Sequence, residues 1–245
     1  MERTAGPATG LCRSQDRRPD SSRRRLMITL YAFKWVPAFA QGLVRDLRVR
    51  WALEEAGIPY REKLLGLGDQ DKPEYRAIQP WGQVPAIEED GRVMFESGAI
   101  VLYIAERSEA LMPRDAEGRA KTLQWVVASL DSLDSYIGPL SDIDLFHAGE
   151  AWAVERRPQV VAQIERRLDA LAGRLGGRDY LEGRFTAGDL MLATVLRNLR
   201  ETDLVTAHPV LGPYLARCEA RPAFQRALDA QMKPFREHAA EFEAA

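Results

Sequence analysis

Cysteine is nearly missing from this chain, and the two that occur, Cys12 and Cys218, lie far apart in the sequence. Their separation excludes a disulfide framework and any CxxC redox or zinc unit. Histidine is equally sparse, since His147, His208 and His238 are scattered and form no group with ligand spacing. We therefore expect no metal cofactor of the usual transition-metal kind.

A strong net charge and long apolar runs are missing as well. The formal net charge is -2 with 29% charged residues, so the chain has no global basic field of the kind that binds nucleic acid. No apolar run reaches the roughly 18 residues that span a bilayer, and the N-terminus has no apolar signal-peptide core. We expect a cytoplasmic protein that has neither nucleic acid nor a membrane as a partner.

What the chain does contain is enough apolar material for a sizeable core. Its 245 residues are 46% hydrophobic, which suits one large domain or two modest ones. Residues 1–26 differ, because they hold seven arginines and few large apolar side chains. We expect a disordered N-terminal extension there. A targeting presequence is the less favoured alternative, since an apolar helical stripe is missing, and Met27 is an alternative natural start.

The segment 27–110 alternates between strand and helix patterns. Asp90-Gly91 between two alternating apolar runs is a strong hairpin signal. The order β-α-β-α-β-β-α is typical of a small α/β layer with a mixed sheet. The expected elements are a strand in ITLYAF, a helix over about 43–55, a strand in IPYREKLL, a helical or irregular link over about 72–78, the hairpin PAIEED with RVMFE, and a helix over about 97–108.

From residue 117 to 240 the periodicity is helical almost throughout, which predicts an all-helical second domain. Thr186 lies three residues before Asp189, directly ahead of the apolar run LMLATVL. This spacing is that of an N-terminal capping box, with Asp in place of the usual Glu or Gln. The clearest helices are expected over 119–135, 159–175, 187–200, 210–220 and 223–232.

The stretch from Gln83 to Ser97 carries the strongest chemical signal. Proline tolerates a cis peptide bond, and a cis Val84-Pro85 bond would turn the backbone N–H and C=O of Val84 outward, where an extended ligand can pair with them. Ser97 stands at an expected helix start, where free N–H groups favour a carboxylate. Glu96 beside it can accept hydrogen bonds from an ammonium group. The alternative is structural, with Pro85 shaping the sheet and Ser97 capping a helix.

In its motifs and their order the chain resembles the glutathione S-transferase family, of cytosolic type and bacterial-like, with the subclass open. The resemblance covers nearly everything after Met27. It implies a thioredoxin-like α/β domain over 27–110 joined to an all-α domain over 117–240. It also implies glutathione as co-substrate and a homodimer. The motifs that carry it are ITLY, RVRWALEEAGIPY, GQVPAI, FESGAIVLYIAE, FTAGDLMLA and RPAFQRAL.

The resemblance also assigns residues to glutathione. Val84 would pair with the cysteinyl unit through its main chain, and Pro85 would provide the cis bond. Glu96 and Ser97 would hold the γ-glutamyl ammonium and carboxylate. Gln83 would approach the glycyl or cysteinyl backbone.

The group that activates the thiol departs from the family pattern. The loop KWVPAFAQGLVRD after the first expected strand has neither Ser nor Cys. Three candidates stay open: the hydroxyl of Tyr31, the charge of Lys34, and the backbone amides near Gln41, Gly42 and Leu43. We rank Tyr31 first among them.

Two functions remain in view. One is an enzyme that adds the glutathione thiolate to a small hydrophobic electrophile, because the loop lacks the cysteine of disulfide-exchanging relatives. The other is a binding or interaction scaffold on the same fold with little or no catalysis. The electrophile would lie between the long loop and the second domain, where four side chains are available to line a cleft: Trp125, Tyr136, Phe146 and His147.

Overall fold

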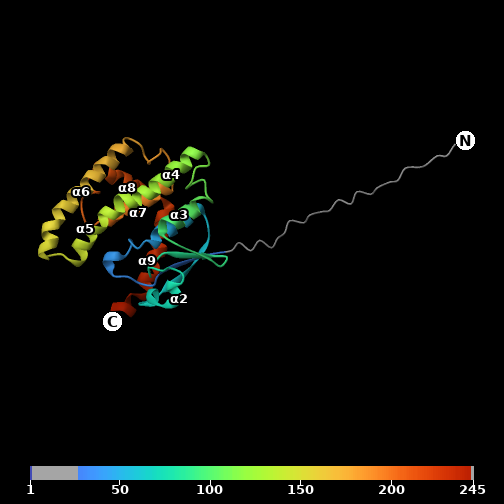
Figure 1. The fold of residues 1–245 in the computed structure, drawn as a ribbon, viewed down its shortest axis with the longest axis horizontal. Helices are drawn as coiled ribbons and strands as arrows, with labels where there is room; N and C mark the ends of the chain where they lie inside the picture. The colour runs from blue at the N-terminus through green and yellow to red at the C-terminus, as the bar shows by residue number, and fades with distance from the viewer. Residues whose placement is uncertain (2–26, 244–245) are drawn as a thin grey trace.

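The computed structural model describes residue 1 and residues 27–243. The expected extension and Cys12 lie outside the described residues. The chain folds into a thioredoxin-like domain followed by an all-helical domain, as the sequence predicts (Figure 1). In Figure 1 the helices α4–α8 gather on one side and the sheet with α2 lies on the other. None of the described helices combines the length and apolar character that crossing a membrane requires.

The first domain is built on a mixed four-stranded sheet with the order β2-β1-β3-β4. β1 is parallel to β2 and antiparallel to β3, and β3 is antiparallel to β4. Asp90 and Gly91 both have positive φ in the β3–β4 turn, which confirms the predicted hairpin. The strands are β1 (Ile28–Phe33), β2 (Tyr60–Leu65), β3 (Ala86–Glu89) and β4 (Arg92–Phe95).

Alternation along β1 divides the side chains between the two faces of the sheet. Ile28 and Leu30 belong to the main core with helices α1 (Asp46–Ala56) and α3 (Ser97–Ala105). Tyr31 faces the other way into a smaller cluster, which consists of Tyr31, Leu65, Tyr75, Val84 and Ala86. The short helix α2 (Pro73–Arg76) contributes Tyr75 to that cluster.

The second domain contains the five expected helices with several changed limits, together with one helix, α5, that the sequence did not predict. The capping box at Thr186 and Asp189 is confirmed at the start of α7. The 3-10 turn Arg197–Leu199 (η4) continues α7, and the π-helical turn Ser129–Asp134 (η3) joins α4 to α5. The helices are α4 (Ala116–Ala128), α5 (Ser135–Phe146), α6 (Ala151–Leu175), α7 (Ala187–Leu196), α8 (Leu211–Glu219) and α9 (Pro222–Glu243).

Four helices have limits that differ from those predicted from the sequence, and three of these differences have a physical reason. The helix expected over 119–135 continues through the π-helical turn into α5. A π-turn contains one more residue than an α-helical turn, so it shifts the spacing of the apolar residues that follow it. Pro158 and Pro234 lie inside α6 and α9, so reading proline as a helix stop cut both helices short. The fourth helix, α1, begins at Asp46, three residues after the expected Leu43.

Candidate functional site

The Val84-Pro85 peptide bond is cis, at the entrance to β3. The pairing of β1 with β3 ends at Tyr31 and Ala86, so Val84 lies just beyond the ladder. Neither the backbone N–H nor the C=O of Val84 has a hydrogen-bond partner within residues 27–243. Its side chain is buried, which fixes the residue while its backbone groups stay available to an extended peptide.

Two residues that the sequence reading missed organise the turn before the cis bond. The side-chain oxygen of Gln79 accepts from the backbone N–H of Trp81 at 2.6 Å and of Gln83 at 3.3 Å. The hydroxyl of Tyr75 donates to the carbonyl oxygen of Gln83 at 2.6 Å. Because the N–H and the C=O of Gln83 each already have a partner, we expect Gln83 to approach a ligand through its side chain.

Ser97 is the first residue of α3, as expected, and it is buried. The residue before it, Glu96, is exposed and has φ 71° and ψ 110°. A non-glycine residue in this region costs on the order of 1–3 kcal/mol and is typical of ligand-binding sites. The strained backbone of Glu96 presents its side chain to solvent next to the free N–H groups that begin α3.

Arg48 is a further residue that the sequence reading missed. It is buried in α1, and its guanidinium donates to Ser97 Oγ at 3.2 Å and to Asp134 Oδ2 at 3.1 Å. Burial lowers the pKa of Arg48 and Asp134 opposes that shift, so the guanidinium stays charged. Asn198 also donates to Asp134, at 3.1 Å. A fixed positive charge therefore lies directly behind the Ser97 hydroxyl, where a carboxylate would be stabilised.

The start of α1 lies close to the cis-proline turn. The side chain of Val44 packs against the cluster that holds Val84 and Tyr75. One turn further along, Arg48 binds Ser97. The structure thus brings together three segments that are distant in sequence: the entrance to α1, the cis-proline turn and the start of α3.

The ring of Tyr31 belongs to the same cluster as Val84 and Tyr75, but its hydroxyl is already engaged by a carboxylate of β3. Its hydroxyl donates to Glu88 Oε2 at 2.9 Å. Since Tyr31 pairs with Ala86, Glu88 and Val84 lie on opposite sides of it along β3. Burial first, and then the hydrogen bond to Glu88, raise the pKa of Tyr31 to about 12. The Tyr31 hydroxyl therefore already donates its proton to Glu88 and would have to leave that partner to donate to a thiolate.

Lys34 lies at the end of β1 and forms an ion pair with Glu241 of α9 at 2.6 Å. The next residue, Trp35, stacks on Phe242 of the same helix with ring centroids 5.1 Å apart. Further along the loop, Phe39 meets Phe146 of α5 edge to face at 5.9 Å. Aromatic side chains of the helical domain therefore pack against the long loop after β1.

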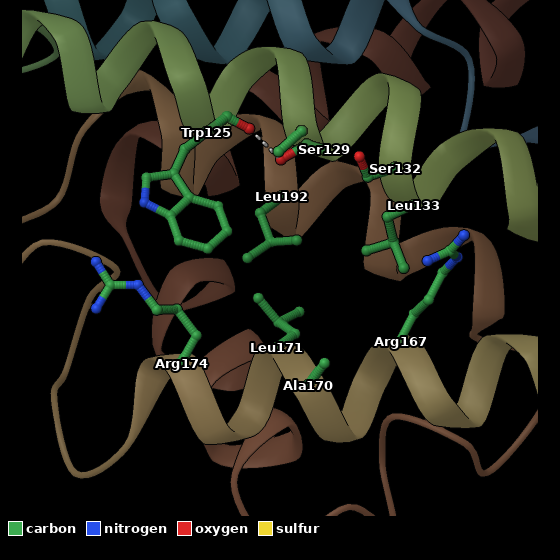
Figure 2. A pocket seen from close by; sticks show the side chains of 10 residues that line it. Trp125, Ser129, Ser132, Leu133, Arg167, Ala170, Leu171, Arg174 and Leu192 are labelled. Carbon is green, nitrogen blue, oxygen red and sulfur yellow. Dashed lines mark hydrogen bonds between the residues drawn. The ribbon is translucent and has the colours of Figure 1, made fainter.

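The other aromatic candidates lie elsewhere. Trp125 lines a pocket of about 250 Å³ between α4, η3, α6 and α7 (Figure 2). Arg167 and Arg174 of α6 lie toward its two ends in Figure 2, and Arg167 also covers the ring of Tyr136. No residue of the thioredoxin-like domain lines this pocket. His147 interacts with Glu150 instead, so Phe146 alone of the four lies against the loop.

Two family models match the chain, described as glutathione S-transferase N-terminal domain over residues 47–107 and glutathione S-transferase C-terminal domain over residues 153–240. The chain belongs to the glutathione S-transferase family.

Individual relatives match over most of their length. The chain is 31% identical to probable maleylacetoacetate isomerase 2 of Drosophila melanogaster over 192 residues, which cover 74% of this chain and 81% of that protein. It is 31% identical over 182 residues to glutathione S-transferase GstA of Escherichia coli O157:H7, with 69% and 82% covered. A glutathione transferase structure from Burkholderia graminis, solved with two glutathione molecules bound per subunit, matches with TM-score 0.72 at 30% identity and covers 83% of this chain and 88% of that one.

Proposed function

We propose that this protein binds glutathione across the three converging segments and adds its thiolate to a small hydrophobic electrophile. In this proposal Val84 pairs with the cysteinyl backbone next to the cis Pro85. Ser97 takes the γ-glutamyl carboxylate, with Arg48 behind it. Glu96 takes the γ-glutamyl ammonium, and the side chain of Gln83 approaches the glycyl end.

The observation that carries the proposal is the complementary pair of anchors. Val84 offers an unpaired backbone donor and acceptor, and Ser97 offers a hydroxyl backed by the buried charge of Arg48. A peptide with an amino-acid head and an extended tail fits both anchors at once. The relative from Burkholderia graminis, whose structure contains glutathione, supports this choice of peptide.

The proposed chemistry is thiolate attack on a carbon electrophile, with alignment of the two reactants as the main contribution of the protein. The thiol proton passes to water, the new bond joins sulfur to carbon, and the leaving group or the opened bond takes the electron pair. The electrophile would approach from the loop side, where the exposed Phe39 and Phe146 form an apolar rim.

A calorimetric titration with glutathione, followed by a conjugation assay with an activated aryl chloride, tests the proposal. We expect saturable binding at micromolar to millimolar glutathione, and turnover above the uncatalysed rate. No binding at millimolar glutathione would contradict the binding site, and binding without turnover would contradict the catalytic part.

The scaffold reading is the second candidate, favoured by a specific observation. The loop after β1 has neither Ser nor Cys, and the Tyr31 hydroxyl is bound to Glu88. If glutathione binds and no activated electrophile reacts, this reading is the better one.

The activator of the thiol stays open between Tyr31, Lys34 and the loop amides. Because the Tyr31 hydroxyl is already donated to Glu88, we expect Tyr31→Phe to change kcat/KM by less than about threefold, well below the ~100-fold loss typical of a removed oxyanion donor. Steady-state conjugation kinetics of the two proteins give the comparison. A fall of tenfold or more at unchanged glutathione affinity would assign activation to the Tyr31 hydroxyl.

A homodimer in the cytoplasm completes the proposal, as family resemblance implies. Sedimentation equilibrium at micromolar concentration is expected to give twice the 27.6 kDa chain mass. A monomer throughout that range would contradict the dimer without touching the glutathione site.

A further inference from the structure

The loop between β1 and α1 is held by its carbonyl oxygens from the helical domain. Arg200 donates from Nη1 to the carbonyl of Gln41 at 2.8 Å and from Nη2 to that of Phe39 at 2.9 Å. Arg197 donates from Nη2 to the carbonyl of Gly42 at 3.2 Å. The planar fork of a guanidinium fixes the direction of the groups that it binds, so these two side chains set the orientation of the loop peptides.

Arg197 is anchored by packed helices, whereas Arg200 is exposed and has an ion-pair partner in the adjacent residue. Arg197 is an ion-pair partner of Glu219 on α8 and lies 5.0 Å from the ring centroid of Phe224 on α9. Arg200 donates from Nε to Glu201 at 3.0 Å. The loop of one domain is therefore positioned by packed elements of the other.

Fixing a carbonyl also fixes the amide of the same peptide unit, because C=O and N–H point in opposite directions across a trans peptide. With the Gln41 carbonyl on Arg200, the N–H of Gly42 points in the direction opposite to that hydrogen bond. That N–H has no acceptor among residues 27–243, whereas the N–H of Leu43 is used by the Ala40 carbonyl at 3.0 Å. Gly42 has φ +77°, a conformation in which other residues are strained.

We propose that Arg197 and Arg200 are positioning residues for thiol activation, and that they aim the Gly42 N–H at the glutathione sulfur. This inference rests on the proposed glutathione site, and it names which of the open activators acts. Ionisation passes the thiol proton to water, and the Gly42 N–H then donates a hydrogen bond to the thiolate. A guanidinium on the carbonyl end polarises that peptide further and strengthens its N–H as a donor.

Arg200→Gln tests the inference, with Arg236→Gln as the matched control, since Arg236 is an exposed α9 side chain that pairs with Asp229. The ultraviolet absorbance of the bound thiolate, followed against pH, reports the pKa of the glutathione thiol. In Arg200→Gln we expect that pKa to rise by about one unit and kcat to fall about tenfold. The dissociation constant of glutathione is expected to change less than about threefold, because Val84 and Ser97 still hold the peptide.

Arg200→Lys separates geometry from charge. Lysine keeps the positive charge and loses the planar fork, so it no longer fixes the directions of the Phe39 and Gln41 carbonyls. We expect it to resemble Arg200→Gln, with faster amide hydrogen exchange over residues 39–45 in both. Full recovery of the thiol pKa by lysine would overturn the positioning role in favour of a simple field. If the melting temperature of Arg200→Gln is far below that of the wild type, the thiol pKa is measured in Arg200→Lys instead.

Different results would overturn the proposed glutathione site and the proposed role of Arg200. A wild-type protein that binds no glutathione overturns the proposed function and this inference together. A wild-type protein that binds and ionises glutathione, with Arg200→Gln folded and showing the wild-type thiol pKa, overturns this inference alone.

Discussion

Ser97→Ala is expected to weaken glutathione binding by about tenfold to a hundredfold. A hydrogen bond to a charged group contributes about 1.5–3 kcal/mol, which corresponds to that range of dissociation constants. The affinity falls because the γ-glutamyl carboxylate loses the hydroxyl that Arg48 holds in place from 3.2 Å. Isothermal titration with glutathione measures the effect directly.

Ser135→Ala is the matched control for this experiment. Ser135 is an exposed serine at the start of α5 whose hydroxyl donates to the carbonyl of Asp131. We expect the glutathione dissociation constant of this variant to stay within about twofold of the wild type. An equal change in both variants, or none in Ser97→Ala, would remove Ser97 from the binding site.

Asp189→Ala is expected to cost about 4 kcal/mol of unfolding free energy. The Asp189 carboxylate is fully buried and accepts from the N–H of Leu181 at 2.9 Å, from the N–H of Thr186 at 3.0 Å and from the hydroxyl of Tyr214 at 3.0 Å. Burial raises the pKa of Asp189, and these donors oppose that shift. Removing the carboxylate leaves several buried donors without a partner, which costs more than losing a cap alone. Urea unfolding followed by circular dichroism gives the free energy.

Asp179→Ala is the control for the stability experiment. Asp179 is an exposed carboxylate that pairs with Arg217 at 3.2 Å, and an exposed ion pair contributes about 0–1 kcal/mol. Equal free energies of unfolding for the two aspartate variants would show that the hydrogen bonds of Asp189 to the capping box and to Tyr214 of α8 do not stabilise the fold.

Local signals in the sequence predicted most of the first domain. The hairpin depends on Asp90 and Gly91, which set the turn by themselves. The capping box depends on residues three positions apart. By contrast, α9 continues past Pro234 to residues whose partners lie two hundred positions away, as the stacking of Trp35 on Phe242 illustrates. Such long-range packing leaves no local pattern to read.

The candidate site also contains residues that a local pattern predicts and residues that only the fold brings in. Val84, Pro85 and Ser97 were predicted as site residues because a Val-Pro bond and a helix-start serine are visible in a short stretch. Arg48 was missed because the charge lies in a helix whose residues 46–53 are all buried between the sheet and the helical domain, which an amphipathic pattern does not reveal.

The strand that contains Tyr31 was predictable from its sequence pattern, but the direction of the Tyr31 hydroxyl was not. Its bond to Glu88 depends on the register of β1 with β3. Likewise, the part that Arg197 and Arg200 play depends on how the two domains dock, and no motif in the loop announces it.

A crystal structure of the protein soaked with millimolar glutathione tests the central claim most directly. The account predicts the cysteinyl backbone on the N–H and C=O of Val84, the γ-glutamyl carboxylate at Ser97, and the sulfur near the entrance to α1. Glutathione bound at another surface, or no bound glutathione at that concentration, would contradict it.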